Sequence, residues 1–126
     1  MNIIRKETAP TYERDKIKSY LLVAESTTGA KNITTTLVEM EPAGVQKIHS
    51  HVTEQCYMLL EGEGIMTVDE EELKVATGDT IFIPSNSPHG LRNIGNKVLR
   101  YVSAGSPVFG KEMERVLWPQ IPEINS

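Results

Sequence analysis

Short apolar runs alternate with polar positions along most of the chain. The runs that are richest in β-branched and aromatic residues lie at 16–24, 32–40, 55–60, 64–68, 72–76, 79–83 and 98–102. Residues of these types are typical of half-buried strands, so each run predicts a β-strand. Residues 1–16 are mostly polar and contain Pro10, which indicates an arm or an irregular first strand.

Turn-forming residues separate these runs. They lie at 27–29, 42–44, 61–64, 69–71, 77–79, 84–88 and 94–96. Short strands at this spacing, without a long amphipathic helix between them, predict an all-β sandwich or closed barrel. A short C-terminal helical segment is expected at 110–118, where Pro119 ends it. No repeat or linker divides the sequence, so we expect a single domain over residues 1–126.

Composition narrows the environment and the partners. The net charge is −4, and acidic and basic residues are interspersed along the sequence. There is no basic patch of the kind that binds nucleic acid, so nucleic acid is not an expected partner. No apolar stretch is long enough to span a bilayer or to form a signal peptide, so a cytoplasmic protein without a membrane partner is expected. The one cysteine, Cys56, lies in an apolar run and is expected to be a small buried residue. The acidic run at 70–72 is expected at a solvated hairpin tip rather than in a metal site.

Three histidines supply the candidate chemistry. His49 and His51 are two residues apart, and in a strand such side chains share one face. His89 opens the run HGLRN directly after the turn PSNSP, in which Asn86 suits a left-handed backbone. A closed sheet would bring the two places together across its interior. The histidines therefore predict a metal site, and a metal-free polar cluster is the alternative.

These residues resemble the two motifs of the cupin superfamily. The first motif, G(X)5HXH(X)3,4E(X)6G, is matched over 44–62, and the second, G(X)5PXG(X)2H(X)3N, over 78–93. The matching positions are Gly44, His49, His51, Gln55, Gly62, Gly78, Pro84, Asn86, His89 and Asn93. The resemblance implies an all-β double-stranded β-helix, the jelly-roll cupin barrel. Gly44 lies one residue too close to His49, Asn86 replaces a glycine, and a glutamine stands where the family has glutamate.

The fourth ligand position falls between two neighbours, Glu54 and Gln55. Motif spacing selects Gln55, because three residues separate it from His51 and six from Gly62. Parity along an extended chain agrees, since 49, 51 and 55 share a face and 54 does not. The amide oxygen of Gln55 is a hard, neutral ligand. Three imidazoles and an amide would leave a divalent ion with its full formal charge of +2, which favours an anionic substrate.

The resemblance implies a divalent metal cofactor (Mn, Fe, Ni or Zn) held by His49, His51, Gln55 and His89. We expect an enzyme that uses this ion as a Lewis acid on a small, oxygen-rich, anionic substrate such as a sugar acid or keto acid. Isomerase, tautomerase, lyase and decarboxylase chemistry all fit. The alternatives are a non-catalytic metal-binding or carbohydrate-binding module and an iron-dependent dioxygenase.

Further side chains are expected around this site. Tyr57 and Leu59 continue the inward face after Gln55, and Tyr57 is a candidate hydrogen-bond donor to substrate. Because side chains alternate along a strand, either Arg100 or Tyr101 faces inward. An inward Arg100 would bind a substrate carboxylate. The alternative is that Arg100 is exposed at the surface. Met58 and Leu60 point outward and suit a homodimer, and Trp118 is expected to help close the barrel.

Overall fold

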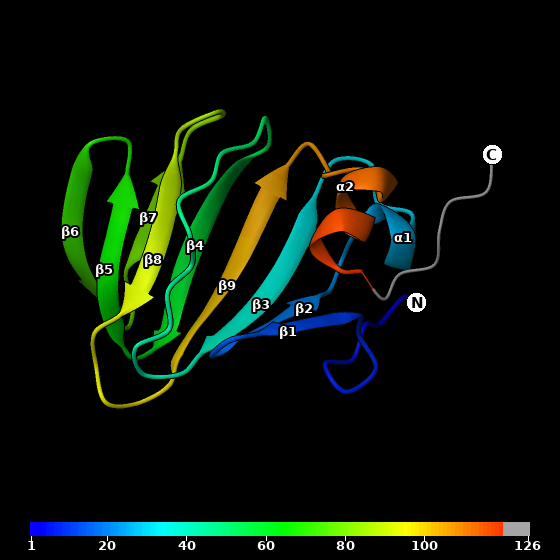
Figure 1. The fold of residues 1–126 in the computed structure, drawn as a ribbon. Helices are drawn as coiled ribbons and strands as arrows, with labels where there is room; N and C mark the ends of the chain where they lie inside the picture. The colour runs from blue at the N-terminus through cyan, green and yellow to red at the C-terminus, as the bar shows by residue number, and fades with distance from the viewer. Residues whose placement is uncertain (120–126) are drawn as a thin grey trace.

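The strands form two antiparallel sheets in the computed structural model, which describes residues 1–119 (Figure 1). The larger sheet has the order β1-β2-β3-β9-β4-β7 and the smaller the order β6-β5-β8. The strands are β1 (Thr11–Arg14), β2 (Ile17–Leu21), β3 (Thr34–Met40), β4 (Glu54–Glu61), β5 (Glu63–Val68), β6 (Glu71–Ala76), β7 (Thr80–Ile83), β8 (His89–Asn93) and β9 (Leu99–Ser106), and the helices are α1 (Glu25–Thr28) and α2 (Lys111–Leu117). This is the double-stranded β-helix, or jelly roll, so the predicted all-β class is confirmed.

Every predicted run contains a strand, and the differences lie at the ends. The run at 16–24 stops at Leu21, because the one-turn helix α1 begins four residues later. That helix was predicted only as a turn. The N-terminal arm contains β1, which pairs with β2 in a tight hairpin. The predicted C-terminal helix is present as α2.

Alternation along the strands builds the core between the sheets. In β3 and β9, every second residue is buried over most of the strand. The core cluster consists of Ile17, Val38, Met40, Tyr57, Leu59, Met66, Val75, Ile83, Leu91, Leu99 and Tyr101. Leu59 thus packs in the core, and it is absent from the lining of the cavity that Tyr57 borders. Non-local pairings such as β3 with β9 then decide which faces meet.

Two turns depend on a left-handed backbone. Gly62 has φ = +87°, and a Cβ there would lie 2.8 Å from the Cα of Leu99. Asn86 has φ = +66°, as its place in PSNSP predicted. The turn after β8 is held by Asn93, whose amide nitrogen donates to the backbone oxygen of Lys97 (2.9 Å) and whose side-chain oxygen accepts from the Gly95 N–H (2.9 Å).

Residues 44–49 run beside β8 as an irregular extension of the smaller sheet. The backbone N–H of Gln46 donates to the carbonyl of Leu91 (2.8 Å). His49 and His89 exchange two backbone hydrogen bonds of 3.0 and 2.9 Å. This pairing joins the two motif segments through their backbones.

The two helices pack together at one end of the larger sheet (Figure 1). The buried carboxylate of Glu114 in α2 accepts hydrogen bonds from the backbone N–H groups of Glu25 and Ser26, both 3.1 Å, at the start of α1. Trp118 is buried against Leu21 and Ala24. Residues 111–118 are therefore fixed against this end of the barrel, as expected for Trp118.

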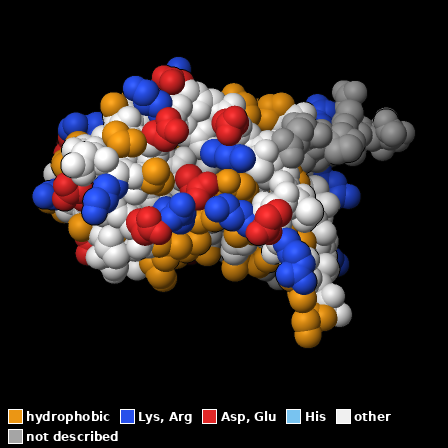
Figure 2. All heavy atoms as spheres, turned by 90° about the horizontal axis from the view of Figure 1, so that it is seen from below, with side chains coloured by type: hydrophobic (Ala, Val, Ile, Leu, Met, Phe, Trp, Pro, Cys, Tyr) orange, Lys and Arg blue, Asp and Glu red, His pale blue; other side chains and the backbone are white. Residues whose placement is uncertain are grey.

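The surface carries mixed charges. Figure 2 shows acidic and basic side chains interspersed over one face, without a large area of one sign. Met58 and Leu60 point outward as predicted and are 44% and 42% exposed, and the homodimer stays a prediction. Among residues 1–119, no helix is both long and apolar enough to cross a membrane.

A polar cluster on the larger sheet is centred on Glu39. Its carboxylate accepts hydrogen bonds from the Tyr20 hydroxyl (2.7 Å) and from Nε and Nη2 of Arg100 (2.9 and 2.7 Å), and it pairs with Lys6 (3.2 Å). Burial alone would raise the pKa of Glu39, but these donors outweigh burial and lower it to about 2. Burial and the bond to Glu39 raise the pKa of Tyr20 to about 12.

Acid should therefore weaken the fold through Glu39. Because its folded pKa is depressed, the stabilisation is complete above the unfolded value of 4.5 and disappears as the pH falls toward 2. We expect Glu39→Gln to cost about 1 kcal/mol at pH 7 and much less at pH 3, after allowance for solvent screening. Urea unfolding at both pH values measures this difference. Glu13→Gln, at an exposed carboxylate, is the control, and an equal cost of Glu39→Gln at both pH values would contradict the prediction.

Candidate metal centre

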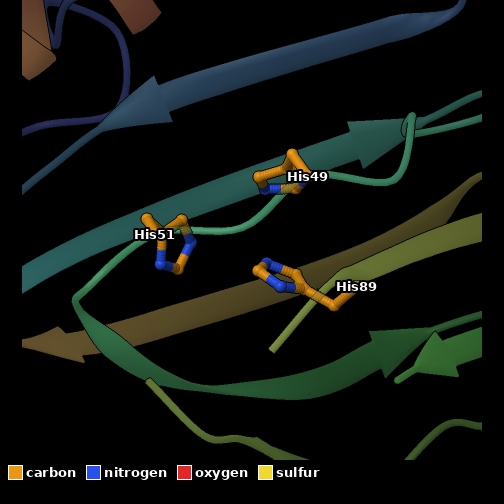
Figure 3. A group of neighbouring side chains, drawn as sticks. All are labelled: His49, His51 and His89. Atoms are coloured by element: carbon orange, nitrogen blue, oxygen red, sulfur yellow. The ribbon is translucent and has the colours of Figure 1, made fainter. Parts of the chain in front are cut away.

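The three histidines come from two segments and converge on one point (Figure 3). His49 and His51 lie on the segment before β4, and His89 is the first residue of β8. The prediction that a regular strand aligns His49 with His51 is wrong, because only His49 forms a β-bridge and His51 lies outside any strand. His51 is held instead by the Asn86 N–H, which donates to its carbonyl (2.7 Å). Turn PSNSP thus positions both His89 and His51.

The rings face one another closely enough to share an ion. Their centroids lie 4.2 Å apart for His49 and His89, 4.8 Å for His51 and His89, and 5.6 Å for His49 and His51. One ring nitrogen from each residue lies within 4.8 Å of the other two. Since metal–imidazole bonds are about 2.0–2.1 Å long, small side-chain shifts would let all three nitrogens bind one ion.

Backbone carbonyls hold all three rings in the same tautomer. Nδ1 of His49 lies 2.9 Å from the carbonyl of Lys47, Nδ1 of His51 lies 2.7 Å from that of Thr53, and Nδ1 of His89 lies 2.9 Å from that of Ser87. A carbonyl only accepts, so each Nδ1 must carry the proton. Each Nε2 then offers a lone pair, which is the form that ligates metal.

Burial favours the neutral form of two of these rings, His49 and His89. It lowers the pKa of His89 to about 4, more than the bond to Ser87 raises it. Burial also lowers the pKa of His49. Neutral imidazoles at physiological pH are what a cation requires, because protons do not compete for the lone pairs.

Two buried acceptors lack any partner in this part of the molecule. Within residues 1–119, Oε1 of Gln55 and Nε2 of His89 are the buried side-chain polar atoms without a hydrogen bond. Buried polar groups are almost always satisfied, so this pair indicates a missing electron-pair acceptor. A divalent cation satisfies both atoms, and the donor set of three imidazoles and one amide suits Mn, Fe, Ni or Zn.

Gln55 and its neighbour point in opposite directions. Gln55 is 6% exposed and lines the same cavity as His49 and His51, whereas Glu54 is exposed. These orientations agree with the spacing argument. Coordination by Gln55 stays a prediction.

The cavity beside the histidines has a volume of about 780 Å³. Tyr57 and Tyr101 stack on its floor with centroids 4.4 Å apart, and Nε2 of Gln46 donates to both hydroxyls (3.2 and 3.1 Å). Phe109 packs edge-on against His51, with centroids 5.3 Å apart. The site therefore joins polar groups on the floor to an aromatic wall.

A sequence model described as "Cupin domain" matches residues 36–105. This range includes both histidine segments, most of β3, strands β4 to β8 and nearly all of β9. The chain belongs to the cupin family.

Known proteins match this chain in sequence, and solved structures match it in fold. The uncharacterized protein MJ1618 of Methanocaldococcus jannaschii is 36% identical, over 83% of this chain and 92% of its own length. Dimethylsulfoniopropionate lyase DddW of Ruegeria pomeroyi is 26% identical, and the match covers 66% of this chain and 53% of the lyase. A crystal structure of a predicted oxalate decarboxylase from Thermotoga maritima has a TM-score of 0.74 and 18% identity, and the match covers 84% of this cupin and 99% of that chain.

The structure places the two candidate substrate-binding residues differently. Tyr57 is buried at the cavity floor, and its ring centroid lies 6.0 Å from that of His89. Arg100 points away from this cavity and pairs with Glu39 and Glu61, while its neighbour Tyr101 faces inward. Because side chains alternate along β9, only one of these two neighbours can face inward. Tyr101 does so and packs in the core.

Sequence reasoning missed other residues of the cavity wall. Arg14, Gln46 and Phe109 all border it, and they come from three different segments. Gln46 lies within the first motif range, at a variable position. Arg14 and Phe109 lie outside residues 36–105, so motif spacing carried no signal for them.

Removing a histidine should abolish metal binding. We expect His51→Ala and His89→Ala to lower metal affinity at least about 100-fold, because each would remove a direct ligand. Elemental analysis of protein purified without added metal, followed by titration of the stripped protein, measures the loss.

Glu54→Gln is the matched control, because its exposed carboxylate should not affect binding, whereas Gln55→Ala should weaken it. If Glu54→Gln removes the metal and Gln55→Ala retains it, the ligand assignment is wrong.

Proposed function

We propose that this cupin binds a divalent metal ion through its three histidines and Gln55, and that it is a lyase, decarboxylase or isomerase of a small carboxylate substrate. The observation that carries the proposal is the pair of unsatisfied buried acceptors, Gln55 Oε1 and His89 Nε2, beside the converging imidazoles. The named activity of the DddW relative, a lyase, supports this class of reaction.

The ligand set determines what chemistry the site would favour. With three neutral imidazoles and a neutral amide, a bound divalent ion would keep its formal charge of +2 and act as a Lewis acid that polarises a substrate oxygen. The proposed ligand set contains no carboxylate that would offset that charge. An anionic substrate is therefore the natural counter-charge in this cavity.

Tyr57 is the candidate donor to substrate. Burial raises the pKa of its phenol, and bonds with Gln46 and Tyr101 offset that only in part, so the hydroxyl stays protonated at neutral pH. A protonated phenol donates a hydrogen bond to a developing negative charge on oxygen. Gln46 fixes the hydroxyl position through the 3.2 Å bond.

The cavity walls would limit water around a bound substrate. Phe109 and Trp118 border the cavity on the side of α2, and α2 is anchored through buried Glu114. Excluding water strengthens electrostatic interactions inside the site. These residues would orient the substrate rather than react with it.

Metal content and turnover together test the proposal. The metal-loaded protein should convert at least one compound in a panel of uronates, keto acids, sugar phosphates, oxalate and dimethylsulfoniopropionate, and His51→Ala should not. Product formation by mass spectrometry is the measurement. Bound metal without turnover would instead favour a non-catalytic binding module. A metal-free wild type, with His51→Ala equally stable, would overturn the proposal.

Gln55→Glu tests the charge argument separately. A carboxylate ligand would lower the formal charge at the site to +1, so we expect metal to bind about tenfold or more tightly and oxalate to bind the loaded protein more weakly. Calorimetric titration of metal, and then of oxalate, gives both affinities. Tighter binding of both ligands would show that Gln55 does not set the charge at the metal.

A further inference from the structure

One guanidinium belongs to the cavity that the metal-site histidines border. Arg14 is the last residue of β1 and lines this cavity together with His49 and His51. It lies outside the family match at 36–105. Arg100, the arginine that alternation made a candidate, lines only a second hollow with Glu39, which Arg14 borders as well.

The hairpin of β1 and β2 holds Arg14 in place. Its Nη1 donates to the Ser19 hydroxyl (2.9 Å) and to the backbone carbonyl of Tyr12 (3.3 Å). Its Cζ lies 4.9 Å from the centroid of the Tyr12 ring. Ser19 is 5% exposed and also lines the cavity. A guanidinium has five N–H donors, and these bonds use Nη1 alone, so donors remain for a ligand.

Among residues 1–119, Arg14 differs from Arg92 and Arg100 in forming no ion pair, although Asp15 also lines the cavity. Arg92 pairs with Glu72 and Arg100 with two glutamates. A partly buried guanidinium beside a cationic metal site favours an anion between them.

The wall near α2 has a different character. Phe109, Met113, Leu117 and Trp118 line the cavity there, and they present apolar surface. A volume of about 780 Å³ is within the range of small-molecule pockets, about 300–1,000 Å³, and exceeds what a two-carbon acid fills. A ligand that matches both parts has an anionic end and an apolar portion.

We propose that Arg14 anchors a carboxylate of the substrate, at the end remote from the oxygen that meets the metal, with an apolar portion of the substrate against α2. This rests on the proposed function, and it narrows the substrate class to carboxylates longer than oxalate. Arg14 is in this view a specificity residue contributed by a strand outside the conserved barrel motifs. Its planar fork suits bidentate recognition of a carboxylate.

Hydroxamates that carry a distal carboxylate test the proposal. The hydroxamate group binds divalent metal through two oxygens, so a series with two to six methylenes scans the distance to Arg14. Each compound is paired with its terminal amide, which has the same shape without the charge. In the zinc-loaded wild type, calorimetry should show at least about tenfold tighter binding of the acid than of the amide at one or more chain lengths.

Arg14→Gln and Arg14→Met should remove that preference and leave the affinity for the amide and for acetohydroxamate within about twofold. Gln retains a donor for the Ser19 hydroxyl, so it guards against loss of the hairpin, which thermal unfolding would reveal. Arg92→Gln, which changes an arginine on the other sheet, should keep the full preference. Lys47→Gln, at the exposed lysine on the cavity rim, should keep it too.

The outcomes separate this proposal from the one on which it rests. Suppose that the protein binds acetohydroxamate but its preference for the acid over the amide survives Arg14→Gln, or is lost in Lys47→Gln instead. Either result overturns the role of Arg14 and leaves the metal site standing. An equal affinity of wild type for acid and amide at all lengths does the same. Failure of the wild type to bind zinc and acetohydroxamate overturns the metal site, and the anchor with it.

Discussion

Backbone pairing between residues 44–49 and β8 holds the site together. His49 and His89 exchange two hydrogen bonds, and Gln46 bonds to Leu91 one step farther along. These bonds hold together two segments that are forty residues apart in sequence, and their imidazoles therefore point to one place. The turn before β8 adds the third ring, because the Asn86 N–H binds the carbonyl of His51. Main-chain geometry, more than side-chain packing, thus creates the ligand set.

That arrangement imposes a cost that a cation would remove. Each Nδ1 is committed to a backbone carbonyl, so each Nε2 lone pair is turned toward the others. Burial lowers the pKa of His49 and that of His89, and Oε1 of Gln55 adds a buried acceptor without a donor. Buried acceptors that lie together without a donor are unfavourable for folding. The same features favour a divalent ion at this place.

Two arginines show how the environment decides a role. Arg100 lies on the central strand β9 and within the family match at 36–105, yet it is neutralised by Glu39 and Glu61 on the outer face of the sheet. Arg14 lies on an edge strand in the polar N-terminal region, where no sequence motif drew attention to it. The β1–β2 hairpin nevertheless places it at the cavity. Both residues are arginines, and they differ in whether the guanidinium is already paired with carboxylates.

The sequence by itself determined the all-β class, the positions of most strands, the left-handed turn at Asn86, the convergence of the three histidines and the burial of Gln55 rather than Glu54. These features depend on local rules, namely period-2 burial, turn chemistry and motif spacing. Tertiary structure alone decided that Tyr101 rather than Arg100 faces inward, that His51 lies outside any strand, and that Arg14 reaches the cavity. Alternation states which residues share a face but not which face becomes the interior, because that depends on pairings such as β3 with β9 between residues far apart in the chain.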